Sequence, residues 1–477
     1  MAGIGFELKK MYAKAGLVNK VQALAYSSLV TIGPMLSCML LVVVVQWLQL
    51  RYGVSFGERE LFLSATVYAF IFSYIISNTL TLYLTRSVSD FLYQGKYDAV
   101  LPSFYGGLKI GMATAAVPAL AFLAFARIDW PMKAALLLLF MTLIVIWFEV
   151  VYLSAMKNYR LISFSFMGGA LVTVAAVWTM FEFTSVRSAS AALFAVDAGF
   201  LLTASALLVQ IEKFFRTPRL RSDYAFLAYL TKYPSLIAVG GLTALGLYSH
   251  QFVQWFGSEG ILVAGTFLMA PKYDLAVYYA FLSVIPSLVL FVVSLETNLY
   301  PKTRQYYDLI LHGGSIGDIR RARQQMFQVL AQQLSLLMGI QLVFSIVSVA
   351  FGIRFLPRIG FTAAQVDLFN ILVMGFYAYI IYTIVWLVLL YFDDRKGVVW
   401  LAVLFLGANT GFTLVSLAFD EQGFSFFLAS FATLIAAFWR LIHLLNHIDY
   451  YTFSAQPVIH REKKNRFAKL LHGEEST

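Results

Sequence analysis

Residues 132–155 read MKAALLLLFMTLIVIWFEVVYLSA, a run in which the only charged side chains are Lys133 and Glu149. A helix that crosses the hydrocarbon core of a bilayer needs roughly 20 mostly apolar residues, so this run is long enough to span a membrane. It is too long for a β-barrel strand and does not alternate between polar and apolar positions. The run therefore predicts a transmembrane helix.

Runs of the same kind recur along the whole chain. Of its 477 residues, 60% are hydrophobic and 13% are charged, whereas soluble domains have about 45–50% and about 25%. We predict twelve spanning helices, at 23–50, 61–85, 104–126, 132–155, 161–183, 188–211, 232–256, 274–298, 330–353, 363–392, 397–419 and 424–447. The predicted fold class is an all-α integral membrane protein.

Lysine and arginine are distributed unequally across this topology. With the N-terminus in the cytoplasm, 26 of the 35 Lys and Arg residues lie on the cytoplasmic side and eight on the other. Cytoplasmic loops of membrane proteins are enriched in these residues, so we expect both termini in the cytoplasm. The same bias explains the formal net charge of +10, and we expect no nucleic acid partner.

The two halves of the chain share the pattern T-x6-R-x3-D-x4-G. The first copy comprises Thr79, Arg86, Asp90 and Gly95, and the second comprises Thr297, Arg304, Asp308 and Gly313. The Arg and Asp of each copy are four positions apart and should share one helix face, and each glycine could end its helix in a left-handed cap. Because each half has an even number of spans, the repeat is parallel. We therefore predict two six-helix lobes related by a pseudo-twofold axis along the membrane normal.

The spans and the repeat together predict how the chain is divided. We expect an amphipathic cytoplasmic segment at 1–22, an N-lobe at 23–211, a cytoplasmic linker at 212–231, a C-lobe at 232–447 with a cytoplasmic loop at 299–329, and a basic cytoplasmic tail at 448–477. Two such lobes are typical of transporters, which bind their cargo near the middle of the bilayer at the interface of the repeats.

Particular stretches of the sequence resemble a known family. MAGIGFELKK at 1–10, the Gly33-Pro34 pair, and the segment from Leu295-Glu296-Thr297 to Tyr306-Tyr307 are similar to the PelG family, transporters of Pel exopolysaccharide in the MOP flippase superfamily. The resemblance implies that the chain moves a GalNAc-rich polymer from the cytoplasm to the periplasm across the bacterial inner membrane. It also implies a synthase complex with a PelF-like cytoplasmic glycosyltransferase and with PelD-like and PelE-like membrane partners.

The residues by themselves leave other functions open. The alternatives are a lipid-linked oligosaccharide flippase, an ion-coupled small-molecule antiporter and a membrane scaffold for the glycosyltransferase. The chain has no Walker A pattern and no extramembrane segment of domain size, so we expect neither ATP hydrolysis nor another enzyme activity. His443 and His447 have the spacing of a metal-binding pair but no further ligand, so we expect no metal and no cofactor.

Ionisable and aromatic residues within the spans are candidates for the translocation path. Asp197 and Glu149 lie in predicted spans, where ionisable side chains usually face the bundle interior. Asp197 could bind a proton or Na⁺ or accept hydrogen bonds from sugar hydroxyls, and a helix-packing hydrogen bond is the alternative. Glu149 could contact cargo or pair with Arg86. Tyr379 and Tyr382 could stack on sugar rings, or they could be packing or interfacial aromatics.

The remaining candidates are gate, docking and hinge residues. As gate or partner-docking residues we predict Arg86, Asp90, Glu296, Arg304, Asp308, Arg320 and Arg321. The alternative for the arginines at the helix ends is binding of lipid phosphate. As helix hinges we predict Gly33, Pro34, Pro234 and Gly240, because proline removes a hydrogen bond from a helix interior.

Overall fold

The computed structural model describes residues 17–156, 159–215, 223–419 and 422–454, and for 17–32, 155–156, 159–160, 296 and 453–454 it describes the backbone alone. Within this part of the chain, 12 helices are long and apolar enough to cross a membrane. This number confirms the prediction. The predicted segment at 1–16 and most of the predicted basic tail lie outside the described residues.

The described chain divides into two compact units. The N unit comprises residues 34–248, 261–269 and 449–454, and the C unit comprises 17–33, 249–260 and 270–448. The boundaries fall inside α2 (Leu17–Arg51) and α8 (Pro234–Trp255), whereas the sequence placed the lobe boundary in the linker before α8. Each of these two helices therefore contributes residues to both units.

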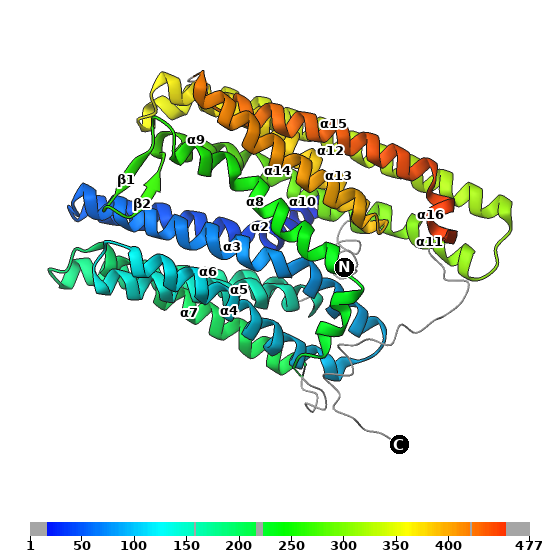
Figure 1. Ribbon diagram of the computed structural model, residues 1–477, viewed down its shortest axis with the longest axis horizontal. Helices are drawn as coiled ribbons and strands as arrows, with labels where there is room; N and C mark the ends of the chain where they lie inside the picture. The colour runs from blue at the N-terminus through cyan, green and yellow to red at the C-terminus, as the bar shows by residue number, and fades with distance from the viewer. Residues whose placement is uncertain (1–16, 157–158, 216–222, 420–421, 455–477) are drawn as a thin grey trace. The chain divides into compact units, whose positions relative to one another are not determined.

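The N unit is a helical bundle with a small hairpin attached (Figure 1). Besides its parts of α2 and α8, its elements are α3 (Phe56–Tyr93), η1 (Tyr97–Ala99), α4 (Val100–Phe125), α5 (Trp130–Met156), α6 (Tyr159–Phe183), α7 (Ala189–Phe214), η2 (Ala225–Thr231), β1 (Ile261–Val263) and β2 (Phe267–Met269). Helix α7 packs along both α5 and α6, and α3 packs along α5.

The hairpin of β1 and β2 was not predicted. Its strands are antiparallel, with Leu262 opposite Leu268, and its turn has positive φ at both Ala264 and Gly265, as in the type I′ turns of tight hairpins. The hydroxyl of Tyr68 on α3 accepts from the Leu268 N–H at 2.9 Å and donates to its carbonyl at 2.9 Å. The hairpin is thereby held to the start of the N-unit bundle.

The C unit contains the remaining helices. They are α9 (Pro271–Phe281), η3 (Leu282–Val284), α10 (Ile285–Ser294), the π-helical turn η4 (Leu295–Leu299), α11 (Tyr300–Leu311), α12 (Ile316–Phe355), η5 (Leu356–Ile359), α13 (Ala363–Tyr391), α14 (Arg395–Ala418), α15 (Phe424–Asn446) and α16 (Ile448–Ser454), which crosses into the N unit after its first residue. Helix α13 packs along α15, α9 and α12.

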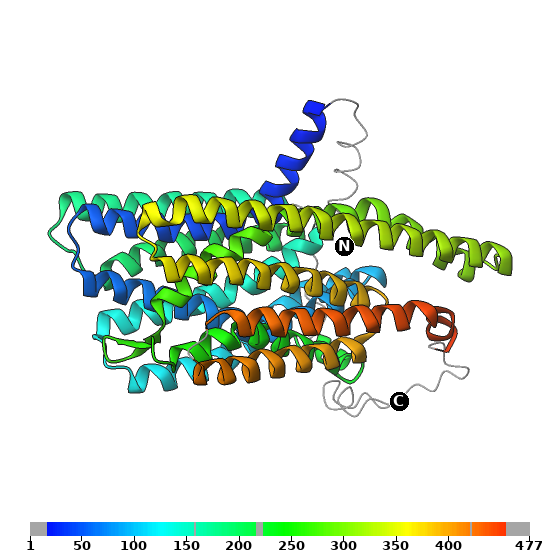
Figure 2. The ribbon, with the colours of Figure 1, turned by 90° about the horizontal axis from the view of Figure 1, so that it is seen from above.

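Residues 299–329, predicted as a cytoplasmic loop, are helical except around 312–315. They form α11 and the first turns of α12, and this pair of helices extends beyond the ends of α13 and α15 (Figure 2). Helix α12 has 40 residues and is therefore about 60 Å long, twice the roughly 30 Å of the hydrocarbon core. Hydropathy located the apolar stretch that begins at 330, and the helix itself begins earlier, at Ile316.

The helix that begins at Pro271 is broken twice before it ends at Leu311. The first break, η3, precedes Pro286, and the buried amide of Gln341 on α12 donates to the Ser283 carbonyl at 3.0 Å. Gln341 also accepts from the Ser287 hydroxyl at 2.5 Å and donates to the Ser345 hydroxyl at 3.2 Å. A side chain from α12 thus supplies a donor for the backbone at the break, as the membrane interior requires.

A buried ion pair joins α14 to α15. Arg440 Nε lies 2.6 Å from Asp394 Oδ2 and its Nη2 lies 2.8 Å from Oδ1, while Asp394 also accepts from the Gly397 N–H as the N-cap of α14. The Asp394 side chain is 5% exposed and that of Arg440 is 20% exposed. This two-pronged geometry is the strongest form of the Arg–carboxylate contact.

Asp394→Asn should therefore destabilise the protein. The variant keeps an acceptor for the helix cap but leaves the largely buried Arg440 without a counter-charge, which costs about 2–3 kcal/mol once its partial exposure is considered. The matched control is Asp308→Asn, because Asp308 is 52% exposed in its pair with Arg304 and such pairs contribute only a few tenths of a kcal/mol. Thermal unfolding of the purified protein in detergent should show a lower midpoint for Asp394→Asn alone, and equal midpoints would contradict this role of the pair.

Candidate functional site

Two acidic residues lie in the interior of the N unit without a hydrogen-bond partner among the described residues. Asp197 on α7 is 1% exposed and Glu149 on α5 is 0% exposed, and neither carboxylate oxygen of either residue makes a hydrogen bond. The predicted packing hydrogen bond of Asp197 and the predicted pairing of Glu149 with Arg86 are therefore not formed. A charge on such a group costs several kcal/mol unless a proton, a cation or a polar ligand meets it.

The two carboxyl groups lie at different depths. Asp197 is eight residues after the start of α7 at Ala189, and Glu149 is seven residues before the end of α5 at Met156. With a rise of 1.5 Å per residue, each is roughly 10–12 Å from its helix end. Because α5 and α7 are separated by one antiparallel helix in the chain, they run in the same direction. Asp197 and Glu149 therefore occupy opposite halves of the bundle.

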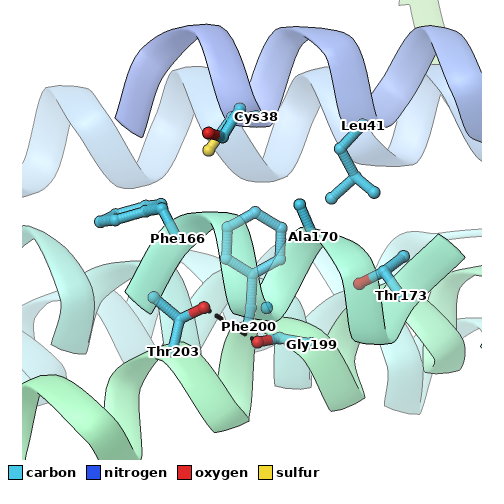
Figure 3. A pocket seen from close by; sticks show the side chains of 10 residues that line it. Cys38, Leu41, Phe166, Ala170, Thr173, Gly199, Phe200 and Thr203 are labelled. Atoms are coloured by element: carbon cyan, nitrogen blue, oxygen red, sulfur yellow. Dashed lines mark hydrogen bonds between the residues drawn. The ribbon is translucent and has the colours of Figure 1, made fainter. Parts of the chain in front are cut away.

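A small cavity lies between α2, α6 and α7 in the N unit (Figure 3). Its volume of about 10 Å³ is close to the least that one water molecule needs. Thr173 and Thr203 line it from α6 and α7, and Cys38 lines it from α2. The Thr203 hydroxyl donates to the Gly199 carbonyl at 3.0 Å, whereas the Thr173 hydroxyl has no partner among the described residues.

At this cavity, α6 and α7 approach each other through glycines. A Cβ on Gly169 would overlap Thr203 Oγ1 and would lie 2.5 Å from the Gly199 carbonyl oxygen. A Cβ on Gly199 would clash in the same way with Thr173 and with the Gly169 carbonyl. The two helices therefore pack through reciprocal Gly-x3-Thr pairs, the small-residue contact that brings membrane helices close together.

The predicted tyrosines belong to the aromatic core of the C unit. Tyr382 on α13 is 1% exposed, and its ring lies 5.2 Å from that of Phe405. The Tyr379 ring packs against Phe376, Phe405 and Phe426 at 5.5–6.2 Å between centroids. Tyr382 presents no open ring face to a polymer in this structure, so the packing alternative describes it better than a place on the path.

The first copy of the repeated motif has the predicted local structure. Arg86 Nε lies 3.3 Å from Asp90 Oδ1, and after α3 ends Gly95 adopts a positive φ of 69°. The Lys96 N–H bonds to the Phe91 carbonyl at 2.9 Å, which closes the helix in the Schellman manner. The ion pair and the left-handed cap are thus confirmed.

The two residues directly before α8, Lys232 and Tyr233, cover this first copy. Asp90 Oδ2 accepts from the Tyr233 hydroxyl at 2.8 Å and lies 3.7 Å from Lys232 Nζ, while the Arg86 guanidinium stacks over the Tyr233 ring at 5.2 Å. A side-chain hydrogen bond with Tyr233 and the charge of Asp90 raise the pKa of Lys232 above its ordinary value. In this structure Arg86 and Asp90 therefore hold the start of α8.

The second copy has the same local structure and a different environment. Arg304 Nε lies 3.5 Å from Asp308 Oδ2, and Gly313 has a φ of 72°. The side chains of Arg304 and Asp308 are 66% and 52% exposed. No tyrosine or lysine among the described residues covers this pair in the way that Tyr233 and Lys232 cover the first.

The other predicted gate and docking residues lie nearby. Arg321 pairs with Asp318 at 2.8 Å and its side chain is 75% exposed, and Arg320 is beside it at the start of α12. Glu296 falls in the π-helical turn η4, but its side chain lies outside the described part of the structure. Among the described residues, no group of three or more His, Cys, Asp or Glu is arranged to hold a metal ion.

The predicted hinge residues lie either inside a helix or at the start of one. Pro34 is inside α2, and the division between the units falls between Gly33 and Pro34. Pro234 is the first residue of α8, where proline removes no helical hydrogen bond, so the physical reason for a hinge there is absent. Gly240 lies against the backbone of Asn78, whose side-chain amide donates to the Gly240 carbonyl at 2.8 Å.

Sequence reasoning missed Gln341 and the partner of Arg440. Gln341 and Arg440 lie in predicted spans, and a polar side chain in a span normally has a partner inside the protein, which was the available signal. The partners themselves could not be identified, because Ser283 and Asp394 are distant in the sequence. Such pairs follow from how the helices pack.

Structural comparison shows what kind of protein has this fold. A mutant of VcmN, a MATE transporter of Vibrio cholerae, superimposes with a TM-score of 0.64 at 15% identity over 94% of this chain and 99% of that chain. A MOP superfamily transporter of Pyrococcus furiosus superimposes with a TM-score of 0.58 at 10% identity over 89% of this chain and 96% of that chain. The chain thus has the two-lobe fold of MOP superfamily transporters.

The sequence places the chain more narrowly within that class. The family model described as "PelG: Putative exopolysaccharide Exporter (EPS-E)" matches residues 1–453, nearly the whole chain. The chain belongs to the PelG family. No curated protein matches it.

Gly169→Ala should destabilise the N unit. The added methyl group would meet the Gly199 carbonyl, which cannot move without separating α6 from α7, at a cost of roughly 1–3 kcal/mol. The matched control is Gly168→Ala on the same helix, because a Cβ there meets nothing within 4 Å. Thermal unfolding in detergent should show a lower midpoint for Gly169→Ala only, and an unchanged midpoint would contradict the close packing.

Pro34→Ala should impair transport while the amount of protein in the membrane stays normal. The variant restores a helical N–H at the point where α2 passes from one unit to the other and so stiffens it. The matched control is Pro118→Ala, because Pro118 is inside α4, which lies entirely within the N unit. Polymer secretion by cells carrying each variant is the measurement, and wild-type secretion by Pro34→Ala would rule out a hinge at this residue.

Proposed function

We propose that this chain moves a GalNAc-rich exopolysaccharide of the Pel type from the cytoplasm to the periplasm, and that it makes or breaks no covalent bond in doing so. The observation that carries the proposal is the match of the exopolysaccharide exporter family over residues 1–453. The transporter fold of the MOP superfamily supports it. We also propose a bacterial inner membrane location with both termini in the cytoplasm, and the unequal distribution of Lys and Arg supports this orientation.

Transport would proceed by alternate or gated opening of the two lobes. The free energy for moving a polymer could come from its elongation by a synthase or from an ion gradient. Two acidic residues in the interior of the N unit help to decide between these sources. Asp197 and Glu149 are buried, lack partners among the described residues and occupy opposite halves of the bundle. Groups of this kind on neighbouring helices could take up and release a proton during each cycle, so we propose proton-linked transport.

The chain would work within a synthase complex. We propose a PelF-like glycosyltransferase and PelD-like and PelE-like membrane proteins as partners, on the strength of the family. The extended pair α11 and α12, with Arg320 and Arg321 at the start of α12, is suited to contact a cytoplasmic protein. A protein that only anchors the glycosyltransferase at the membrane would use the same surface. Measuring polymer export by the chain with and without that surface distinguishes such a scaffold from an exporter.

An ion-coupled antiporter of small molecules is the second candidate function. The resemblance of the fold to MATE transporters and the unpartnered acids in the N unit favour it. A lipid-linked oligosaccharide flippase has the same architecture. Expression in cells without other exporters separates these functions, because an antiporter would raise resistance to cationic drugs and a polysaccharide exporter would not.

Asp197→Asn should abolish most polymer export. The amide has nearly the same shape as the carboxyl group, so the bundle should fold, but it cannot take up and release a proton. We expect at least a tenfold fall in secreted polymer at normal membrane levels of the protein, and Glu149→Gln should act in the same direction. The measurement is secreted polysaccharide per cell.

The matched control is Glu182→Gln, because Glu182 is an exposed acid whose carboxylate accepts from the Tyr52 hydroxyl at the end of the same bundle. It should secrete normally. Unchanged secretion by Asp197→Asn would show that this carboxyl group takes no part in transport, and export would then be driven in another way.

A further inference from the structure

Helix α11 presents tyrosines and an ion pair on one exposed face. The face comprises Tyr300, Arg304, Tyr307 and Asp308. Successive members are four, three and one residues apart, which places all of them along the same side of a helix. Tyr300 is 37% exposed, and the side chains of Arg304 and Asp308 are 66% and 52% exposed. An exposed and a half-buried tyrosine therefore lie on the same face as an exposed ion pair.

A third tyrosine joins this face from another helix. Tyr391, the last residue of α13, reaches the Thr303 side chain of α11 and lies in the neighbourhood of Tyr300 and Tyr307, without direct ring contact. It is 36% exposed. Both helices belong to the C unit. The three tyrosines thus gather at the end of α13 that the sequence predicts to be cytoplasmic.

The first copy of the repeat shows what such a pair can bind. There the Tyr233 ring lies beneath Arg86 and its hydroxyl donates to Asp90, and Tyr233 is 2% exposed. A flat ring with a hydroxyl group therefore fits against an Arg–Asp pair of this spacing. In the second copy, no segment of the described chain takes that place, and the pair stays accessible.

A sugar ring has the chemistry that this face would recognise. The C–H face of a pyranose packs on aromatic rings, and its hydroxyl groups donate to a carboxylate and accept from a guanidinium, which are the stronger kind of hydrogen bond. The Arg304–Asp308 pair carries no net charge, so it offers little attraction to the phosphate of an anionic lipid. A hydroxyl-rich, uncharged sugar residue suits the face better.

We propose that Tyr300, Arg304, Tyr307, Asp308 and Tyr391 form a binding platform for a sugar residue of the exported polysaccharide. The platform would hold the polymer at the end of the C unit that is predicted to be cytoplasmic. This inference rests on the proposed function, because it takes its ligand from the polymer that the chain would export.

The test uses the purified full chain in nanodiscs of zwitterionic lipid, with GalNAc oligosaccharides as the probe. The double variant Tyr300→Ala/Tyr391→Ala should bind at least tenfold more weakly than the wild type, because both stacking surfaces are lost. The double variant Tyr300→Phe/Tyr391→Phe keeps both rings and should bind within about threefold of the wild type. Asp308→Asn should weaken binding through the loss of the charged acceptor.

The matched control is Tyr93→Ala/Tyr97→Ala. These tyrosines are 94% and 54% exposed beside the glycine cap of the first copy, where Lys232 and Tyr233 already cover the ion pair. This variant should bind as the wild type does. Secreted polymer measured in cells for the same variants should follow the binding affinities.

The outcomes separate the platform from the proposed function. If the wild type binds and exports polymer and Tyr300→Ala/Tyr391→Ala does both equally well, the platform is wrong and the function stands. If the wild type neither binds the oligosaccharide nor exports polymer, the proposed function fails and the platform with it. In a second set of nanodiscs that contain anionic lipid, the same variants are compared for lipid retention. If Tyr300→Ala/Tyr391→Ala changes only the retention of anionic lipid, the face binds headgroups and the platform is likewise overturned.

Discussion

The structure depends on the requirement that polar groups inside a membrane find partners within the protein. The requirement makes the spans helical, since each helix satisfies its own backbone. Where the helix after Pro271 is broken, Gln341 supplies a donor to the buried Ser283 carbonyl. Where a charge is needed near a helix end, Arg440 and Asp394 meet in a two-pronged contact. Among the described residues, Asp197 and Glu149 are exceptions to the requirement, and this is why the proposal of proton-linked transport rests on them.

The division of the chain into units bears on how such a protein moves. The boundaries fall inside α2 and α8 and not in the linker between the sequence halves. From Asp223 onward the linker is fastened to the N unit, because Asp223 pairs with Lys109 at 2.6 Å and the Phe226 carbonyl accepts from the Tyr83 hydroxyl. The start of α8 is held by Asn78 at Gly240. Relative motion of the units would therefore bend helices and leave the described linker in place.

Local features of the fold were predictable from the sequence, and features that depend on packing were not. The number of spans follows from hydropathy, and the caps at Gly95 and Gly313 follow from motifs whose parts are a few residues apart. The helical form of 299–329 was missed because hydropathy reports the membrane boundary and not the helix end. The positive φ of Ala264, which the hairpin turn needs, has no signal in an alanine.

In the candidate site, too, the sequence predicted the local features and could not predict those that depend on packing. Composition identified Asp197 and Glu149 as acids within spans, but only the packing of α5 and α7 shows that both lack partners among the described residues. The sequence could not choose among the tyrosines, because the choice depends on which face of α13 each ring occupies. Tyr382 packs in the aromatic core, while Tyr391, nine residues later, lies exposed beside α11.

Uptake of polysaccharide by reconstituted vesicles tests the central claim most directly. Purified protein is placed in sealed liposomes as the sole protein, a proton gradient is imposed, and radiolabelled GalNAc polymer fragments are added outside. The account predicts lumenal accumulation that is faster than in protein-free liposomes and that stops when the gradient is collapsed. If thermal unfolding shows that the protein is correctly folded and accumulation still equals that of protein-free liposomes, the result would contradict transport of this polymer by the chain.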